Sequence, residues 1–516
     1  MTPAATRNAT SATRTDQPRR ARRSRRPFLS TFSSLCFEFS SWSSCPSWLI
    51  IFVAFVAAVG AQEPDRSKAP ALGPPPKLDL PAIRKKVLTN GLPVWIIERH
   101  KVPLVQVNLV IQAGANEDPQ GKFGLASFTA AMLDEGAAKR SALEIADALD
   151  FLGAVLATTS SFDSSAVRLN VPVARLQEAL PIFADVVLRP TFPQPDIERL
   201  RQERLTSLLQ ARDDAQSIAS MAFNRIAFGP AHRFGTGAIG TESTIKSFTV
   251  DDLRRFHGTY YAPGSSALIV SGDVSASVVP LLEQQFGTWN TPAPARTPIP
   301  PAPPLTSRQI YLVDKPGAPQ SQIRIGGVGV ARATPDYFPL LVLNTILGGS
   351  FTSRLNQNLR ETHGYTYGAS STFDMRLAPG PFVAGAGVQT DKTADALREF
   401  FKELEGIHKP VDSGELTKAK NYVALGFPGE FETLADLSRR TEELIVYKLP
   451  DDYFERYIPN VQAVIAQAVH AAAMKYIQPS KFAVVVVGDR KTIEAPVRAL
   501  NLGPVRVMSV MEALPQ

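Results

Sequence analysis

The spacing of hydrophobic residues changes between two periods along the chain. Residues 102–114 carry apolar side chains at every second position, which predicts a β-strand. Residues 124–137 then place Leu125, Phe128 and Met132 three and four positions apart, which predicts a helix. Strand and helix signals continue beyond this point without strict alternation. We therefore predict an α+β fold with mostly antiparallel sheets flanked by helices.

The chain contains an internal repeat. Residues 263–273 (PGSSALIVSGD) and 479–489 (PSKFAVVVVGD) both run from proline through an apolar segment to Gly-Asp, and they lie 216 positions apart. Residues 103–109 (PLVQVNL) and 319–325 (PQSQIRI) share the same offset of 216. Two separate segments with one offset predict two homologous domains that arose by duplication.

Proline-rich segments mark the predicted domain boundaries. We assign residues 62–82 and 291–307 to extended linkers, because both are dense in proline. The N-terminal domain then covers 83–290 and the C-terminal domain covers 308–516. Residues 1–61 differ in composition from both domains and form a leader.

The leader has the order of a secretory signal. A basic run ending near Pro27 precedes an apolar stretch from Trp48 to Val59 and the small residues Gly60 and Ala61. We expect cleavage after Ala61, a secreted or periplasmic location, and no stable membrane span after cleavage. An uncleaved N-terminal membrane anchor is the alternative, and a start codon placed too early would also explain the long leader.

Most of the positive charge and both cysteines lie in the leader and not in the two predicted domains. The leader holds eight arginines against Asp16 and Glu38, so residues 62–516 carry a formal charge of +1 out of the total of +7. This balance argues against nucleic acid as a partner. Both cysteines, Cys36 and Cys45, also lie in the leader, so the domains contain no disulfide and no cysteine metal site.

Three segments resemble one family. Residues 88–133, 234–274 and 348–368 are similar to the pitrilysin/insulinase-type zinc metallopeptidases, which include the mitochondrial processing peptidase. The likeness extends over most of residues 85–495. It implies a duplicated α+β fold of the processing-peptidase type, in agreement with the repeat.

The resemblance also shows what this chain lacks. Catalytic members carry H-x-x-E-H, in which two histidines on one helix face bind zinc and the glutamate is the general base, and a second glutamate downstream completes the site. The matching positions here are Ser127, Ala130, Ala131 and Ser207. The resemblance therefore implies a non-catalytic subunit type that holds no zinc and is inactive alone.

A second candidate site lies in LRETHGYTYG, residues 359–368. Leu355 and Leu359, four positions apart, predict a short helix, and Gly364 predicts its stop before a strand. Arg360 and Tyr367 are seven residues apart, and catalytic relatives often use such a pair to bind the substrate backbone. We interpret Arg360 and Tyr367 as substrate-binding residues. The alternative is an arginine that stabilises a helix end and a tyrosine packed on the sheet.

These features favour one function over two others. The chain is interpreted as the non-catalytic subunit of a heterodimeric secreted peptidase, which binds peptides while a homologous partner supplies zinc and the general base. A catalytically inactive structural or peptide-binding scaffold is the alternative. An autonomous metalloendopeptidase with unusual ligands ranks third.

Overall fold

The computed structural model describes residue 73 and residues 78–296 and 298–514. The chain divides into two units, Met1–Leu72 and Gly73–Gln516, and all described residues belong to the second. The predicted signal and its cleavage point lie outside the described residues. Among the described helices, none has the length and apolar character needed to cross a bilayer.

The first sheet has six strands in the order β1-β2-β8-β3-β7-β6. Its β2–β8 pair is parallel and its other pairs are antiparallel. The strands in this order are Ile83–Val87, Pro93–Glu98, Ser266–Gly272, Leu104–Ile111, Ser165–Pro172 and Val155–Ser160.

The second sheet also has six strands, in the order β11-β12-β10-β13-β9-β14. The β13–β9 and β14–β9 pairs are parallel and the others are antiparallel. The strands in this order are Thr366–Phe373, Pro381–Gln389, Gln320–Val328, Ala483–Gly488, Gln309–Asp314 and Val505–Met508.

The predicted duplication is confirmed strand by strand. The central order β2-β8-β3-β7-β6 of the first sheet matches β9-β13-β10-β12-β11 of the second. β2 and β9, β3 and β10, and β7 and β12 each begin 216 residues apart. The copies differ at one edge, where β1 pairs antiparallel with β2 but β14 pairs parallel with β9. The predicted α+β class with mostly antiparallel sheets is also confirmed.

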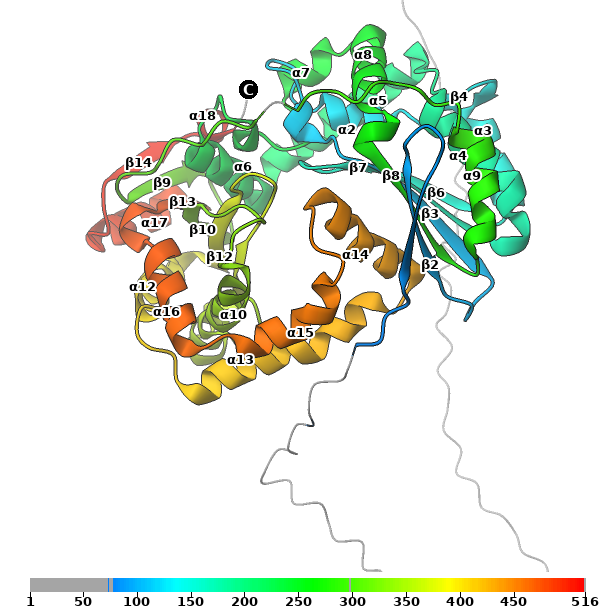
Figure 1. The fold of residues 1–516 in the computed structure, drawn as a ribbon. Helices are drawn as coiled ribbons and strands as arrows, with labels where there is room; N and C mark the ends of the chain where they lie inside the picture. The colour runs from blue at the N-terminus through cyan, green and yellow to red at the C-terminus, as the bar shows by residue number, and fades with distance from the viewer. Residues whose placement is uncertain (1–72, 74–77, 297, 515–516) are drawn as a thin grey trace, which may run out of the picture. The chain divides into compact units, whose positions relative to one another are not determined.

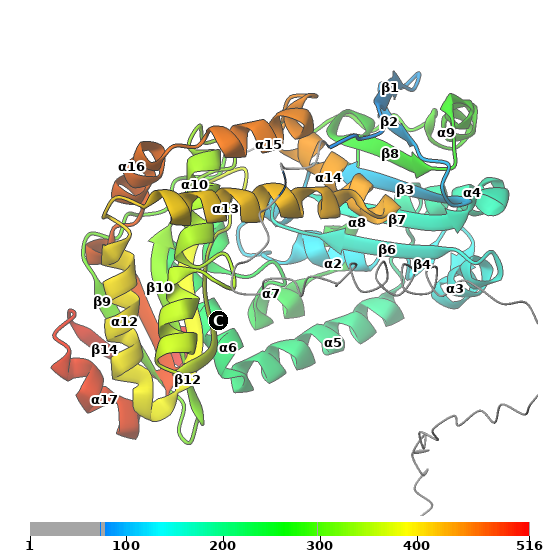
Figure 2. The same cartoon turned by 90° about the horizontal axis from the view of Figure 1, so that it is seen from below.

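Helices flank both sheets (Figures 1 and 2). In the first half they are α2 (Leu125–Ala131), α3 (Ala142–Phe151), α4 (Leu176–Leu188), α5 (Gln194–Asp213), α6 (Ala215–Phe228), α7 (Glu242–Ser247), α8 (Val250–Tyr260) and α9 (Val279–Phe286). In the second half they are α10 (Tyr337–Leu347), α11 (Arg354–Asn356), α12 (Thr393–Gly406), α13 (Ser413–Gly426), α14 (Leu434–Val446), α15 (Tyr453–Ala463), α16 (Ala466–Tyr476), α17 (Arg490–Ala499) and α18 (Val510–Ala513).

The helix predicted over 124–137 is shorter than expected. α2 ends at Ala131, and Gly136–Ala137 instead form strand β4, which pairs with β5 (Arg140–Ser141). Met132 and Leu133 are still fully buried. The apolar spacing therefore identified the buried residues, but the strand pairing fixed where the helix ends.

The two halves exchange a helix. α6 from the first half packs on the second sheet, where Ile218 and Phe223 join a buried cluster with Val485 and Val487 of β13. α14 from the second half lies beside β8 and β3 of the first sheet (Figure 1), and Ser438 Oγ lies 2.9 Å from Ser271 Oγ of β8. This exchange joins the halves into one folded unit.

Removing the hydroxyl of Ser438 tests this exchange. Ser438 and Ser271 are both fully buried, so Ser438→Ala is expected to lower the free energy of unfolding by about 1 kcal/mol through loss of one hydrogen bond. Urea titration measures the change. The double variant with Ser271→Ala also removes the bond from Ser271 Oγ to the Leu434 carbonyl (3.3 Å), and it is expected to cost less than the sum of the two single changes. A larger, additive loss would contradict a direct interaction between the two residues.

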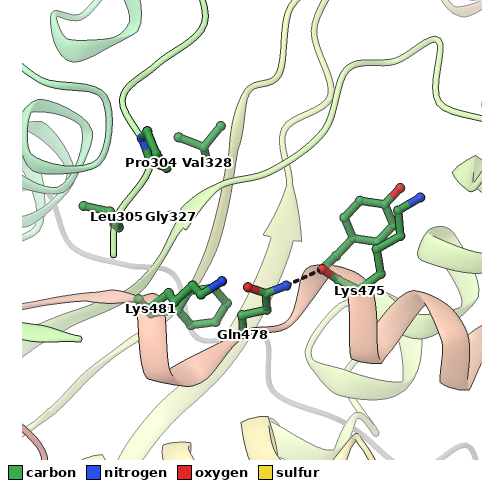
Figure 3. Close-up of a pocket in the computed structure, with 9 residues that line it drawn as sticks. Pro304, Leu305, Gly327, Val328, Lys475, Gln478 and Lys481 are labelled. Carbon is green, nitrogen blue, oxygen red and sulfur yellow. Dashed lines mark hydrogen bonds between the residues drawn. The ribbon is translucent and has the colours of Figure 1, made fainter. Parts of the chain in front are cut away.

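The segment predicted as the interdomain linker forms no helix or strand at its described residues, 291–296 and 298–307. Pro304 and Leu305 line a cavity of about 260 Å³ together with Gly327 and Val328 at the end of β10 (Figure 3). Lys475, Gln478 and Lys481 close its other side, and Gln478 Nε2 donates a hydrogen bond to Lys475 O (2.9 Å). This cavity contains none of the residues predicted to form a functional site.

Candidate functional site

The helix that matches the zinc-binding helix of the family is α2. A buried carboxylate holds its N-terminus in place, because Asp118 accepts hydrogen bonds from the backbone N–H groups of Gly124 and Ala126, both at 2.7 Å. Asp118 also pairs with Arg233 at 2.8 Å, and both side chains are almost fully buried. The start of α2 is therefore fixed by charge and by hydrogen bonds.

An arginine that sequence reasoning missed contacts the first of the matched positions. Arg204 of α5 donates from Nη1 to Ser127 Oγ (2.8 Å) and from Nη2 to the Ser127 carbonyl (2.7 Å). Its guanidinium carbon lies 5.0 Å from the centre of the Phe128 ring. Burial lowers the pKa of Arg204 to about 10. Within the described residues Arg204 forms no ion pair, so no carboxylate contacts its positive charge.

The matched positions do not fit zinc. Ala130 and Ala131 offer only methyl groups, and the hydroxyl of Ser207 donates to the Glu203 carbonyl one turn earlier (2.9 Å). The side chains at these four positions include no imidazole, thiolate or carboxylate, which are the groups that bind zinc. The guanidinium of Arg204 also lies against the Ser127 hydroxyl. Across the described part of the chain, no group of three or more His, Cys, Asp or Glu side chains is arranged to hold a metal ion.

The position of Arg204 beside Ser127 should weaken zinc binding in a variant that regains the family's zinc motif. Restoring all four side chains while Arg204 remains is expected to give weak zinc binding, because a cation beside the site repels Zn²⁺. Adding Arg204→Ala is expected to raise the zinc affinity by about tenfold or more. Competition with a chelating dye measures both affinities. Equal affinities would contradict this role for Arg204. The four changes are Ser127→His, Ala130→Glu, Ala131→His and Ser207→Glu.

The second candidate site has the predicted helix, stop and strand. α11 continues into a π-helical turn, η6 (Gln357–Thr362), Gly364 has a φ of +67°, and β11 begins at Thr366. Leu355 and Leu359 are fully buried, as helical spacing requires. The π-turn was not predicted, and π-turns inside helices occur frequently at functional sites.

Arg360 and Tyr367 each lie at an irregularity of the backbone. Arg360 lies on the π-turn, and Tyr367 lies at a β-bulge, where the pairing of β11 with β12 shifts between Thr366 and Ala369. Thr366 Oγ1 stabilises the bulge by accepting from the Gly368 N–H (3.1 Å). A bulge places an extra residue in one strand and redirects the side chains beside it. Tyr367 is therefore exposed, although Ala369 and Ser371, two and four positions later, are buried.

Both side chains keep donors available. Tyr367 is 89% exposed, and within the described chain its hydroxyl makes no hydrogen bond. Arg360 is 37% exposed, forms a 3.4 Å ion pair with its neighbour Glu361, and lies 4.5 Å from the centre of the Phe351 ring. The structure shows no contact between Arg360 and Tyr367. It places them at the same helix–strand junction with their polar groups open to a ligand.

Comparison with known proteins agrees with this fold. The family model "Insulinase (Peptidase family M16)" matches residues 94–233, and "Peptidase M16 inactive domain" matches residues 247–423. A crystal structure of a peptidase M16 inactive domain from Pseudomonas fluorescens has 26% sequence identity and a TM-score of 0.73, covering 79% of this chain and 98% of that one.

Two curated relatives carry different names. An uncharacterized zinc protease, YmxG, from Bacillus subtilis is 26% identical over 344 residues, which are 66% of this chain and 82% of the relative. A non-peptidase homolog, YmxG, from Helicobacter pylori is 21% identical over 405 residues, 78% of this chain and 92% of the relative. The chain thus belongs to the insulinase family of peptidases, as a member without the zinc-binding side chains on α2.

Proposed function

We propose that this chain is the non-catalytic subunit of a heterodimeric zinc peptidase and that it binds peptide substrate through Arg360 and Tyr367. A homologous partner subunit supplies the zinc ion and the general base. The observation that carries the proposal is a bulge and a π-turn at one helix–strand junction, where the bulge holds Tyr367, which is 89% exposed, and the π-turn holds Arg360.

The chemistry of the pair suits a peptide backbone. A guanidinium and a phenol both donate hydrogen bonds, and a peptide carbonyl accepts them. During hydrolysis that carbonyl oxygen becomes an oxyanion, and positioned donors stabilise it more strongly than they stabilise the ground state. Arg360 and Tyr367 therefore assist cleavage even though the metal belongs to the partner.

The proposed location rests on the leader. Its basic run, apolar stretch and small residues support export and cleavage after Ala61, and the proposed location of the folded chain is the periplasm or the outside of the cell. An N-terminal anchor is the alternative location. Subcellular fractionation together with N-terminal sequencing of the mature protein distinguishes the two.

A scaffold without a catalytic role is the second candidate. The relative from Helicobacter pylori is named a non-peptidase homolog, which favours this reading, whereas the relative from Bacillus subtilis is named a zinc protease. An autonomous metalloendopeptidase would need ligands that the matched positions lack. A zinc assay on the isolated chain tests that third possibility.

Peptide binding by this chain alone tests the proposed role of the pair. A fluorescent library of short unstructured peptides is titrated with the mature chain, and binding is followed by anisotropy. The double variant Arg360→Ala/Tyr367→Phe is expected to lose most of the affinity. The control is Tyr365→Phe, which removes a neighbouring phenol that the proposal does not use. Equal peptide affinity of the wild-type chain, the double variant and Tyr365→Phe would contradict the proposed site.

A further inference from the structure

A second arginine is buried away from both candidate sites. Arg332 lies between β10 and α10 and is 7% exposed. Its guanidinium carbon lies 3.6 Å from the ring centre of Tyr337 and 5.2 Å from that of Tyr453. Nη2 donates to the Tyr453 hydroxyl at 2.5 Å. Aromatic rings therefore surround this cation.

No acidic side chain of the described residues forms an ion pair with Arg332. Glu443 of α14 lies in the same cavity, but both of its oxygens accept hydrogen bonds from Arg440 Nη1, at 2.8 and 2.9 Å. Arg440 Nε is buried and has no hydrogen-bond partner within the described residues. Arg440 also pairs with Glu430 at 3.2 Å, so Arg440 has two carboxylate partners, whereas Arg332 has none among the described residues. A buried cation of this kind is costly unless an anion joins it.

Arg332 and Arg440 line a cavity of about 380 Å³ between α10 and α14. Leu340 and Leu341 of α10 and Met375, which follows β11, supply apolar walls. A concave site of this size with apolar walls and a few polar groups is typical of small-ligand binding. α14 also packs on the first sheet, and Tyr447, which lines the cavity, donates a hydrogen bond to Asp163 of the first half (3.3 Å).

We propose that this cavity binds the carboxylate of a ligand with an apolar body, and that the guanidinium of Arg332 receives the carboxylate. The planar fork of an arginine matches the two oxygens of a carboxylate. The leucine and methionine side chains contact the apolar body. The C-terminal residue of a peptide and a free branched carboxylic acid share this chemistry. The proposal uses neither Arg360 nor Tyr367.

Calorimetric titration of the full chain, with no partner subunit, tests the proposal. The probes are an N-acetylated pentapeptide ending in leucine, the same peptide with a C-terminal amide, and 4-methylpentanoate. The peptide acid is expected to bind at least about tenfold more tightly than the amide. Binding of both acids, or of the peptide acid alone, assigns the site to peptide C-termini. Binding of 4-methylpentanoate alone assigns it to free acids, and each result supports a carboxylate site.

Two variants separate binding from folding. Arg332→Gln removes the charge, and Thr372→Trp fills the cavity from an exposed position on β11 that lines it. Each is expected to weaken binding of the acid probe by about tenfold or more. Arg308→Gln is the matched control, since Arg308 lies 4.4 Å from the centre of the Phe401 ring and outside this cavity. Its binding is expected to stay unchanged.

Three results would overturn the proposal. The first is measurable binding of both the peptide acid and its amide with equal affinity. The second is wild-type affinity in Thr372→Trp, or in Arg332→Gln with an unchanged circular dichroism spectrum. The third is no saturable binding of either acid up to roughly 10 mM, which is weaker than specific small-ligand binding normally is. Because no partner is present, none of these results bears on cleavage by the heterodimer.

Discussion

Arg360→Ala is expected to lower the rate of peptide cleavage by the assembled heterodimer by about 100- to 1000-fold, the usual effect of removing one donor to a developing oxyanion. Arg360 lies within the π-turn η6, and its side chain is 37% exposed. The loss should appear in kcat as well as in kcat/KM, because the donor is needed most in the transition state. Tyr367→Phe removes the hydroxyl alone and is expected to act in the same direction.

Two controls make this result specific. Arg398→Ala removes an exposed arginine that pairs with Asp395 at 2.8 Å on α12, and Tyr365→Phe removes the phenol nearest to Tyr367 in sequence. Both variants are expected to cleave at close to the wild-type rate. Size-exclusion chromatography establishes that each variant still assembles with the partner. Wild-type cleavage by an assembled Arg360→Ala heterodimer would show that the pair has no role in catalysis.

Asp118→Ala is expected to lower the free energy of unfolding by about 3–5 kcal/mol, the usual cost of breaking a buried ion pair. The change leaves the buried guanidinium of Arg233 without its carboxylate and leaves the Gly124 and Ala126 N–H groups without their acceptor. Both kinds of loss have a desolvation cost in the folded state that solvent relieves in the unfolded state. Chemical denaturation of the mature chain measures the change.

The exposed pair of His100 and Asp273 provides the comparison for this experiment. Their side chains lie 2.7 Å apart but are 58% and 37% exposed. Asp273→Ala is expected to change the free energy of unfolding by about 1 kcal/mol or less, because solvent screens exposed pairs. Similar losses in Asp118→Ala and Asp273→Ala would contradict the importance assigned to burial at α2.

The sequence was sufficient for the duplication and for the junction that carries Arg360 and Tyr367. Proline and Gly-Asp signals recur at an offset of 216 because equivalent strands begin and end at equivalent turns in both copies. Leu355, Leu359 and Gly364 predicted the helix and its end because helical spacing and a left-handed glycine are local properties of the chain.

Long-range packing explains what the sequence did not predict. Arg204 reaches Ser127 across 77 residues, and no local period identifies such a contact. The exchange of α6 and α14 depends on which sheet each helix covers, although both helices have ordinary amphipathic patterns. The bulge at Tyr367 depends on the register of β11 against β12, and side-chain alternation within β11 does not reveal that register.

The most direct test of the proposed function is to co-express this chain with a homologue that retains H-x-x-E-H. Zinc content and cleavage of a quenched peptide library are measured for each chain alone and for the pair. Cleavage is expected from the pair alone, with zinc bound to the homologue and none to this chain. Zinc bound to this chain, or full activity of the homologue by itself, would contradict the proposed function.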